Sequence, residues 1–204
     1  MENIVKITIQ NLECNGFAVR YFETANEAAA AILGEVKPGE TAGFGGSMTL
    51  ENMRIRESLE SRGIVTFYHG TAKSPAERAS ILENEARTDV YFASSNAVTS
   101  DGRLVNVDGS GNRISSMAFG HKRVYIVAGT NKIVKNYEEA IVRIKNVASP
   151  LNTKRLSKNT PCAKTGKCEN CDSPERICNV TLVHDRPPYG FVTSVFLVGE
   201  SLGY

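Results

Sequence analysis

Short strand-like runs alternate with helix-like runs over the first half of the chain, and this alternation constrains the fold more than any other feature. Apolar strand-like runs occupy residues 17–22, 41–44, 64–68 and 90–93, with helix-like runs between them at 24–33, 49–59 and 75–87. A strand, a helix and a second strand in succession are typical of βαβ units, whose strands lie parallel in one sheet. We therefore expect an α/β protein with a mostly parallel sheet.

Two of these helices carry local signals for their first turn. Thr24 is followed three residues later by Glu27, and Ser74 by Glu77, which is the spacing of a capping box. Pro75 would occupy the first position of its helix, where the missing N–H costs nothing. These signals predict that the two helices begin after Thr24 and Ser74.

The second half of the chain is less regular. Asp-Gly pairs at 101–102 and 108–109 separate short alternating runs, which predicts a small hairpin or meander. Residues 124–129 and 192–198 return to a buried-strand pattern, the latter tying the end of the chain into the sheet. Between them, 137–147 has helical periodicity, with Tyr137, Ile141, Ile144 and Ala148 on a face expected to pack on the sheet and Pro150 as the stop.

Length and charge exclude several classes of protein. The 204 residues suit one domain over 1–204, since a single core stops growing only at about 250 residues or more. The net charge of 24 − 22 = +2 is spread along the chain, which is not the footprint of a nucleic-acid-binding protein. No run approaches the about 18 apolar residues of a membrane helix, and the first residues do not resemble a secretion signal. We expect a cytoplasmic protein with no membrane or nucleic-acid partner.

A glycine-rich loop between a predicted strand and a predicted helix is the first candidate site. Its residues Gly45, Gly46, Ser47 and Thr49 would present backbone N–H groups and hydroxyls to an anionic small molecule. The alternative is a tight turn in which Ser47 or Thr49 only caps the helix. The loop matches neither the phosphate-binding loop of nucleotide hydrolases nor the dinucleotide fingerprint, so the sequence contains no nucleotide motif.

Lys132 and Asn112 are further candidates for binding an anion. Lys132 follows a strand end, where open α/β folds bind their ligands, and Asn112-Arg113 could act in the same way. The alternative is that Asn112 forms a turn and that both cations are ordinary solvated charges. The three histidines, His69, His121 and His184, share no motif.

Four cysteines lie within residues 160–179, close to the end of the chain. Cys162, Cys168, Cys171 and Cys178 are separated by five, two and six residues, with Lys164, Lys167 and Arg176 nearby to favour the thiolate form. This density of thiols in a polar segment predicts a metal site, holding either zinc or an iron–sulfur cluster, although the spacing fits neither template cleanly.

Two other interpretations of the cysteines stay open. In one, the four thiols bind no metal; in the other, Cys168 and Cys171 act alone as a redox pair. The fifth cysteine, Cys14, stands apart near the end of an amphipathic stretch and is expected to be a small buried apolar residue.

Several stretches together resemble the lactate-utilisation (LUD) domain family. The residues that carry the resemblance include those of the glycine loop and of the predicted hairpin and extend over nearly the whole chain. They are GFGGSMTL at 43–50, NAVTSDG at 96–102, GSGNR at 109–113, NKIV at 131–134, ASPLN at 148–152, the cysteine segment and VGESLGY at 198–204.

The resemblance implies a three-layer α/β/α fold similar to that of ribose-5-phosphate isomerase and the CoA transferases, with the glycine loop at the ligand site. Sugar-phosphate isomerases of this kind tend to carry an acidic residue after the strand that 90–93 matches. Here that position holds Asn96, and an amide cannot act as a general base. Asp101 is close in sequence but sits at a predicted turn, so the isomerase interpretation is weakened.

Three functions follow as hypotheses. The resemblance favours an accessory ligand-binding or redox-coupling subunit in the oxidation of L-lactate to pyruvate, working beside iron–sulfur partner subunits. The alternative is a free-standing enzyme on a small phosphorylated or CoA-linked metabolite, with Asn96, Asp101 and Lys132 around the glycine loop. In the third, the cysteine segment is a redox sensor on an α/β scaffold. The sequence does not decide whether the chain is catalytic.

Overall fold

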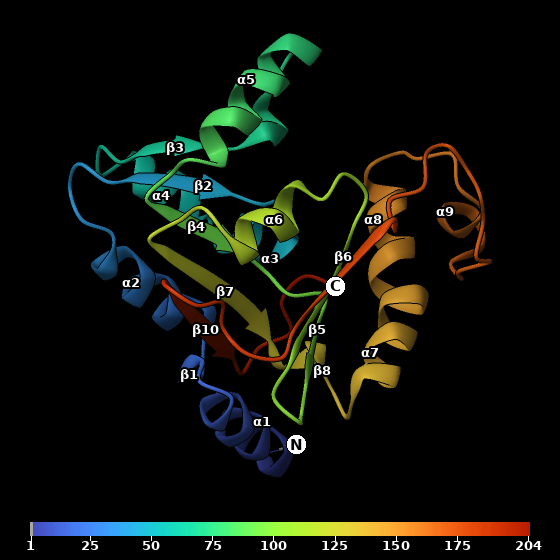
Figure 1. Cartoon of the computed structure of the whole chain (residues 1–204), viewed down its shortest axis with the longest axis horizontal. Coiled ribbons are helices and arrows are strands. Elements are labelled where there is room, and N and C mark those ends of the chain that lie inside the picture. The colour runs from blue at the N-terminus through green and yellow to red at the C-terminus, as the bar shows by residue number, and fades with distance from the viewer. Residues whose placement is uncertain (1) are drawn as a thin grey trace.

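The computed structural model describes residues 2–204 and places a six-stranded sheet at the centre of the protein (Figure 1). The order of its strands is β1-β10-β7-β4-β2-β3, and every neighbouring pair is parallel. The predicted α/β fold with a mostly parallel sheet is therefore confirmed. The strands are β1 (Ala18–Phe22), β2 (Thr41–Phe44), β3 (Val65–Phe67), β4 (Val90–Ala93), β7 (Arg123–Gly129) and β10 (Val192–Val198).

Helices cover both faces of this sheet and give it three layers (Figure 1). On one face, Ile32 of α2 and Ile55 and Leu59 of α4 are fully buried with the aromatic rings of β4, β7 and β10. On the other face, Leu12 of α1 and Met117 of α6 are fully buried against the opposite side of the same strands. The helices involved are α1 (Glu2–Cys14), α2 (Ala25–Glu35), α3 (Met48–Asn52), α4 (Ile55–Glu60), α5 (Pro75–Glu85) and α6 (Asn112–Ala118).

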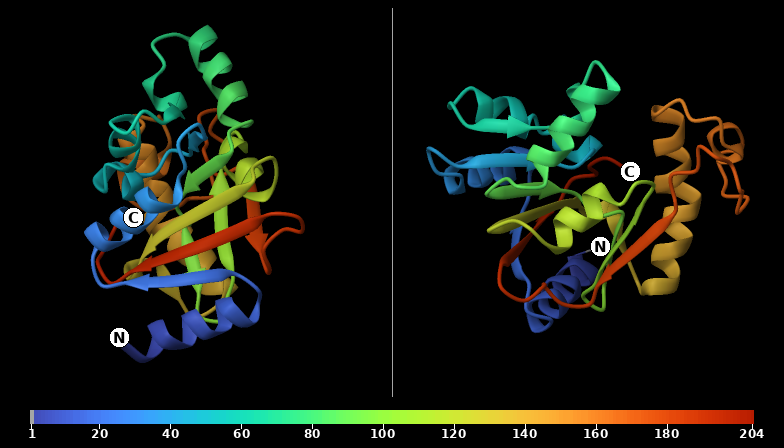
Figure 2. Two further views of the ribbon diagram at one scale, coloured as in Figure 1. Left: turned by 90° about the vertical axis from the view of Figure 1, so that its left-hand side faces the viewer. Right: turned by 45° about the horizontal axis from the view of Figure 1, so that its top comes forward.

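The two edge strands of the sheet are β1 and β3. α1 lies beside the edge strand β1, as both views in Figure 2 show. At the opposite side, β2 joins β3 through α3 and α4. The last strand, β10, pairs with both β1 and β7, which confirms that the end of the chain is tied into the sheet.

A second, four-stranded sheet lies beside the first, in the order β8-β5-β6-β9. The predicted hairpin is the antiparallel pair β5 and β6, in which Ala97 lies opposite Val105. Tyr137, Ile141 and Ile144 of the predicted apolar face pack against this second sheet together with Ala140, rather than against the parallel sheet. The remaining elements are β5 (Ala97–Thr99), β6 (Leu104–Asp108), β8 (Ile133–Val134), β9 (Val180–His184), α7 (Tyr137–Arg143), α8 (Ser149–Arg155), α9 (Pro161–Thr165), the π turn Ile144–Ala148, and 3-10 turns at His69–Thr71 and Thr130–Lys132.

Both predicted helix starts are confirmed. The Thr24 hydroxyl accepts a hydrogen bond from the Glu27 amide, and the Glu27 carboxylate accepts one from the Thr24 amide, so the capping box is complete. Ser74 caps α5 by accepting from the Glu77 amide at 3.1 Å. Each cap satisfies amide groups that have no partner inside the helix.

Three predictions about local structure are wrong. The helix expected over 49–59 is broken into α3 and α4, because Arg54 takes a left-handed conformation with φ of 53°. Pro150 does not stop its helix, because the π turn Ile144–Ala148 continues directly into α8 and Pro150 lies in the first turn of α8. Cys14 is exposed rather than buried, because it lies on the outer face at the end of α1.

In the part of the chain from residue 2 onward, no helix has both the length and the apolar character needed to cross a membrane.

Candidate functional site

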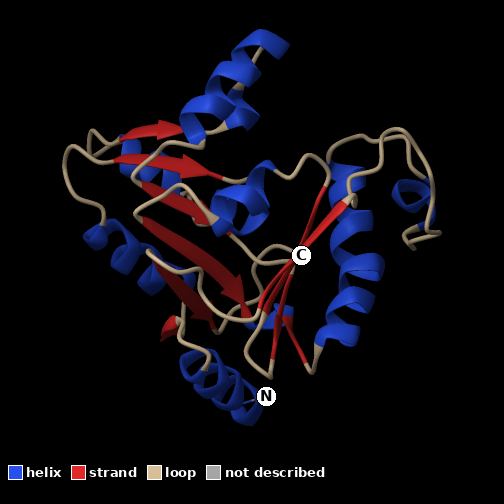
Figure 3. Cartoon of the chain, viewed as in Figure 1, coloured by secondary structure: helices blue, strands red, loops and turns tan. Residues whose placement is uncertain are grey.

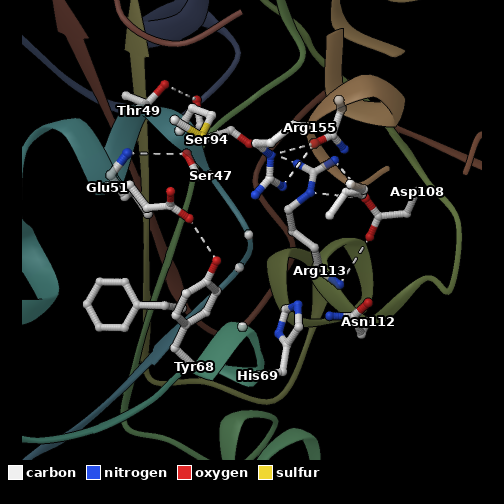
Figure 4. Close-up of a pocket in the computed structure, with 18 of the residues that line it drawn as sticks. Ser47, Thr49, Glu51, Tyr68, His69, Ser94, Asp108, Asn112, Arg113 and Arg155 are labelled. Carbon is white, nitrogen blue, oxygen red and sulfur yellow. Dashed lines mark hydrogen bonds and ion pairs between the residues drawn. The ribbon is translucent and has the colours of Figure 1, made fainter. Parts of the chain in front are cut away.

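A cleft of about 910 Å³ opens at the carboxyl ends of the parallel strands. Several residues around it lie within three residues of a strand end: Gly45 after β2, His69 after β3, Ser94 after β4 and Lys132 after β7. The carboxyl ends of parallel strands meet at one edge of a sheet, which is where open α/β folds bind ligands. Figure 4 shows side chains from several of these loops pointing toward one another.

The glycine loop forms one wall of the cleft. The Gly45 amide is used by the sheet, since it donates to the Phe92 carbonyl at 2.9 Å, and a Cβ at Gly45 would lie 2.8 Å from Arg113 Cγ. Gly46 faces open space instead, where a Cβ would have its nearest neighbour at 4.0 Å, the Nε2 atom of His69. Gly45 is thus required for packing, while Gly46 leaves room beside the loop.

Ser47 has the capping role that the sequence left as an alternative. Its hydroxyl accepts from the Leu50 amide at 3.3 Å and begins α3. Within residues 2–204 the amides of Gly46, Ser47 and Met48 have no acceptor. The cap and the free amides coexist, so the local structure is compatible with both interpretations of the loop.

Lys132 is the most unusual side chain of the site. It is 3 % exposed, and its Nζ donates to the Thr49 hydroxyl at 3.0 Å and to the Ser94 hydroxyl at 2.9 Å. No carboxylate in residues 2–204 pairs with it. Burial, together with the nearby charges of Arg143 and Arg113, lowers the pKa of Lys132 to about 7. A buried cation that only hydroxyls contact is costly for the fold and attracts an anion.

Arg113 lines the cleft beside Gly45 of the glycine loop, and its side chain is fully engaged with the protein. Its guanidinium bonds to Asp108 Oδ1 at 3.0 Å through Nε and 2.8 Å through Nη2, and Nη1 donates to the Ser94 carbonyl at 2.8 Å. Figure 4 shows this pair beside Asn112. Because Asp108 ends β6 and Ser94 follows β4, Arg113 joins the second sheet to the first.

Asn96 belongs to the same network. Its Oδ1 accepts from Arg113 Nη2 at 2.9 Å and from the Val107 amide at 2.8 Å. Arg143 Nη1 donates to the Asn96 carbonyl at 2.6 Å. The side-chain oxygen of Asn96 is therefore used in hydrogen bonds that connect the two sheets.

The structure brings together seven of the eight candidates for ligand binding and leaves one outside. Asp101 is exposed in the turn between β5 and β6, where it contacts Thr99 and Arg103, and it does not line the cleft. The residues that do line it are Gly45, Gly46, Ser47, Thr49, Asn96, Asn112 and Lys132.

A histidine–glutamate pair is the feature that sequence analysis missed. His69 Nδ1 lies 2.8 Å from Glu85 Oε2, and the same carboxylate oxygen accepts from the His69 amide at 3.2 Å. Glu85 is 2 % exposed, whereas His69 lines the cleft. The position of His69 after a strand end is the signal that selected Lys132, and it would have selected His69 as well.

The cleft has an excess of positive charge. Six of its lining residues are cationic and three are acidic, with histidine counted as neutral. Arg155 bonds to the neutral groups of Asn152 and Tyr204, and Arg78 to the carbonyl of His69, so neither has an acidic partner in the described chain. The cations are Arg56, Arg78, Arg113, Lys132, Arg155 and Lys158, and the acids are Glu51, Glu57 and Asp108.

The cysteine segment is mostly loop (Figure 3), and none of its four cysteines lines the cleft, although Ile177 of the same segment does. Cys162 Sγ is near the hydroxyls of Thr153 and Thr160, whereas Cys178 Sγ accepts from Arg176 Nε at 3.2 Å. All of these thiols are free, and residues 2–204 contain no group of three or more cysteine, histidine or acidic side chains arranged to hold a metal ion. A metal at these four cysteines therefore stays a prediction.

The fold and the cleft define an α/β protein whose parallel sheet has, at its carboxyl edge, a cleft lined by an excess of positively charged side chains. Residues 5–188 match the model of the LUD domain, and the chain therefore belongs to the LUD domain family. No curated protein matches the chain. A crystal structure of a DUF162 family protein from Deinococcus radiodurans is similar in fold, with a TM-score of 0.57 and 13 % identity over 97 % of this chain and 98 % of that one.

Proposed function

We propose that this chain is an accessory ligand-binding subunit of a system that oxidises L-lactate to pyruvate, and that its cleft holds a small carboxylate. Membership of the LUD family supports the connection with lactate utilisation. The observation that carries the proposal is the buried ammonium of Lys132, which has two hydroxyl partners and no carboxylate in the described chain. A bound carboxylate supplies the missing negative charge.

The electrostatics favour this ligand class for a simple reason. The pKa of Lys132 is held near 7 because the charged form is poorly solvated in the protein interior. An anion within hydrogen-bonding distance stabilises the charged form and raises this pKa. Binding of the anion and protonation of Lys132 are therefore coupled, and each favours the other.

The size of the cleft favours a second candidate, a free-standing enzyme on a phosphorylated or CoA-linked metabolite. A volume of about 910 Å³ is more than a three-carbon acid fills. Arg78 and Arg155, without acidic partners, are available to bind additional negative charges such as those of a phosphate group. In this proposal the same Lys132 site would bind one end of a larger ligand.

Calorimetric titration separates the two candidates. The purified chain is titrated with L-lactate, pyruvate, inorganic phosphate and coenzyme A in turn. The first proposal expects heat from the carboxylates, and the second expects tighter binding of phosphate or coenzyme A. Binding of none of the four would contradict both.

Partner subunits are tested separately. The tagged chain is recovered from cells grown on L-lactate, and co-purification of an iron–sulfur or flavin subunit is expected for the accessory role. Recovery of the chain without such a partner, together with normal growth on lactate of a strain that lacks the chain, would argue for the free-standing enzyme.

A metal at the cysteine segment stays a separate hypothesis. Four thiolates can close on one ion only if the segment rearranges, as happens where metal binding is coupled to folding. Elemental analysis of protein purified without oxygen, compared with a variant that has serine at all four positions, tests it. Iron and sulfide in the native chain but not in the variant would favour a redox-coupling role, and zinc would indicate a structural site. The absence of any metal from the native chain would contradict the hypothesis.

A further inference from the structure

The pair formed by His69 and Glu85 has the geometry of an acid–base device. The Glu85 carboxylate is buried behind the cleft and contacts Nδ1 of the imidazole, which leaves Nε2 as the nitrogen on the cleft side. Within residues 2–204, Nε2 has no hydrogen-bond partner. The glycine loop lies next to this nitrogen, and a Cβ built on Gly46 would be 4.0 Å from Nε2.

Glu85 is itself held in place by several contacts. It accepts hydrogen bonds from the His69 amide at 3.2 Å and from the Tyr91 hydroxyl at 3.3 Å. Burial and the Glu85 charge raise the pKa of Tyr91 well above its usual value, so this hydroxyl stays a neutral donor. The carboxylate is therefore positioned before any ligand binds, and it orients the imidazole with the Nδ1 proton toward itself.

The position of the pair in the fold puts it beside the proposed ligand. His69 follows β3, the glycine loop follows the adjacent strand β2, and both line the cleft. Figure 4 shows His69 near Arg113 and Asn112, with the Ser47 segment on the other side. A ligand that lies along the glycine loop has one face toward Nε2.

We propose that His69, positioned by Glu85, is a general acid–base residue that moves a proton to and from a 2-oxo acid bound in the cleft. This inference rests on the proposed function, because a 2-oxo acid is the oxidised form of the hydroxy acid assigned to the site. Nε2 takes a proton from the carbon next to the carbonyl group. The C–H bond breaks, an N–H bond forms, and the electron pair of the carbon is delocalised onto the carbonyl oxygen as an enolate.

The step needs no oxidant or reductant, because returning the proton regenerates the starting acid. In deuterated water the returned hydrogen is deuterium, so the reaction appears as exchange at the methyl group of pyruvate. A histidine with a free nitrogen and an oriented ring is suited to this transfer near neutral pH. The excess of cations in the cleft favours the enolate by electrostatic attraction.

The test follows loss of the pyruvate methyl signal by proton NMR in deuterated buffer. We expect the full chain to accelerate exchange over buffer and His69→Ala to slow it about 10²-fold or more. Added imidazole should restore part of the rate in His69→Ala, which a purely structural role of His69 would not allow. Lys73→Gln, an exposed change in the same loop but outside the cleft, is the matched control and should exchange like the unmodified chain.

Glu85→Gln tests the positioning role. The amide oxygen can still accept hydrogen bonds from His69, but the charge is gone, so the exchange rate should fall while pyruvate affinity is unchanged. Calorimetry on the same samples separates the possible failures. Binding of pyruvate without exchange above buffer would overturn the role of His69 and leave the proposed ligand site standing, whereas no binding and no exchange would overturn both.

Discussion

Asp108 and Arg113 form a buried ion pair, 2.8 Å between Oδ1 and Nη2, and this pair holds the second sheet against the cleft. Both side chains are 10 % exposed, and Asp108 also accepts from the amides of Arg113 and Ile114. The part of the cleft wall that packs against Gly45 is therefore in place before a ligand arrives. Arg113 contributes to the site mainly by its position.

Removal of the Asp108 carboxylate should destabilise the fold strongly. Asp108→Ala leaves the Arg113 guanidinium buried without its counter-charge, which typically costs about 3–5 kcal/mol. The free energy of unfolding in urea measures this. Asp185→Ala is the control, because the Asp185–Arg103 pair is well exposed and should be worth about 0–1 kcal/mol. Equal effects of the two substitutions would contradict the structural role given to Asp108.

The buried charge of Lys132 should lower the free energy of unfolding of the unliganded protein. Its pKa is lowered from 10.5 to about 7, so the unfolded chain binds more protons than the folded chain between these values and stability rises with pH there. Below about pH 7 the penalty is complete. Lys132→Met should therefore be more stable than the unmodified chain near pH 7, as expected for a site optimised for binding.

The pH dependence of this difference is the measurement. The advantage of Lys132→Met should shrink by up to about 3 kcal/mol between about pH 7 and about pH 9.5, because the unmodified lysine loses its charge in the folded state. Lys135→Met, an exposed lysine three residues further on, should show no such change. A difference between Lys132→Met and the unmodified chain that is the same at both pH values would contradict the account.

The two glycines of the loop should respond differently to alanine. A Cβ at Gly45 would come within 3.0 Å of both Arg113 and the Tyr91 hydroxyl, so Gly45→Ala should cost about 1–3 kcal/mol of stability. Gly46→Ala meets nothing closer than 4.0 Å and should fold normally. The added methyl group lies between the loop and His69, so Gly46→Ala should weaken ligand binding. Thermal unfolding and calorimetry on both variants check this, and normal ligand affinity in Gly46→Ala would place the ligand elsewhere.

Local sequence signals predicted those parts of the fold that depend on local contacts. Thr24 and Ser74 cap their helices because both partners of each hydrogen bond lie three residues apart. The break at Arg54 carries no glycine or proline and could not be read from the sequence. The prediction for Pro150 was wrong because a proline can follow the end of one helix or lie in the first turn of another. Here the π turn Ile144–Ala148 leads directly into α8, so Pro150 lies in a first turn.

The candidate site was partly predictable for the same reason. Lys132 and the glycine loop were found because they follow strand ends, and parallel strands place such residues at one edge. The pairing of His69 with Glu85 depends on how α5 packs back on β3, which no spacing in the sequence reveals. Asp101 lies near Asn96 in sequence, but the β5–β6 hairpin carries its turn away from the cleft.

The most direct test of the central claim is calorimetric titration of pyruvate and inorganic phosphate into the unmodified chain, Lys132→Met and Lys135→Met. We predict that Lys132→Met loses at least about tenfold in affinity, equivalent to about 1.4 kcal/mol, while Lys135→Met binds normally. We also predict that affinity for the anion falls as the pH rises above about 7, because the unliganded Lys132 loses its proton there. An affinity that is the same in Lys132→Met and in the unmodified chain would contradict the role of Lys132 in binding.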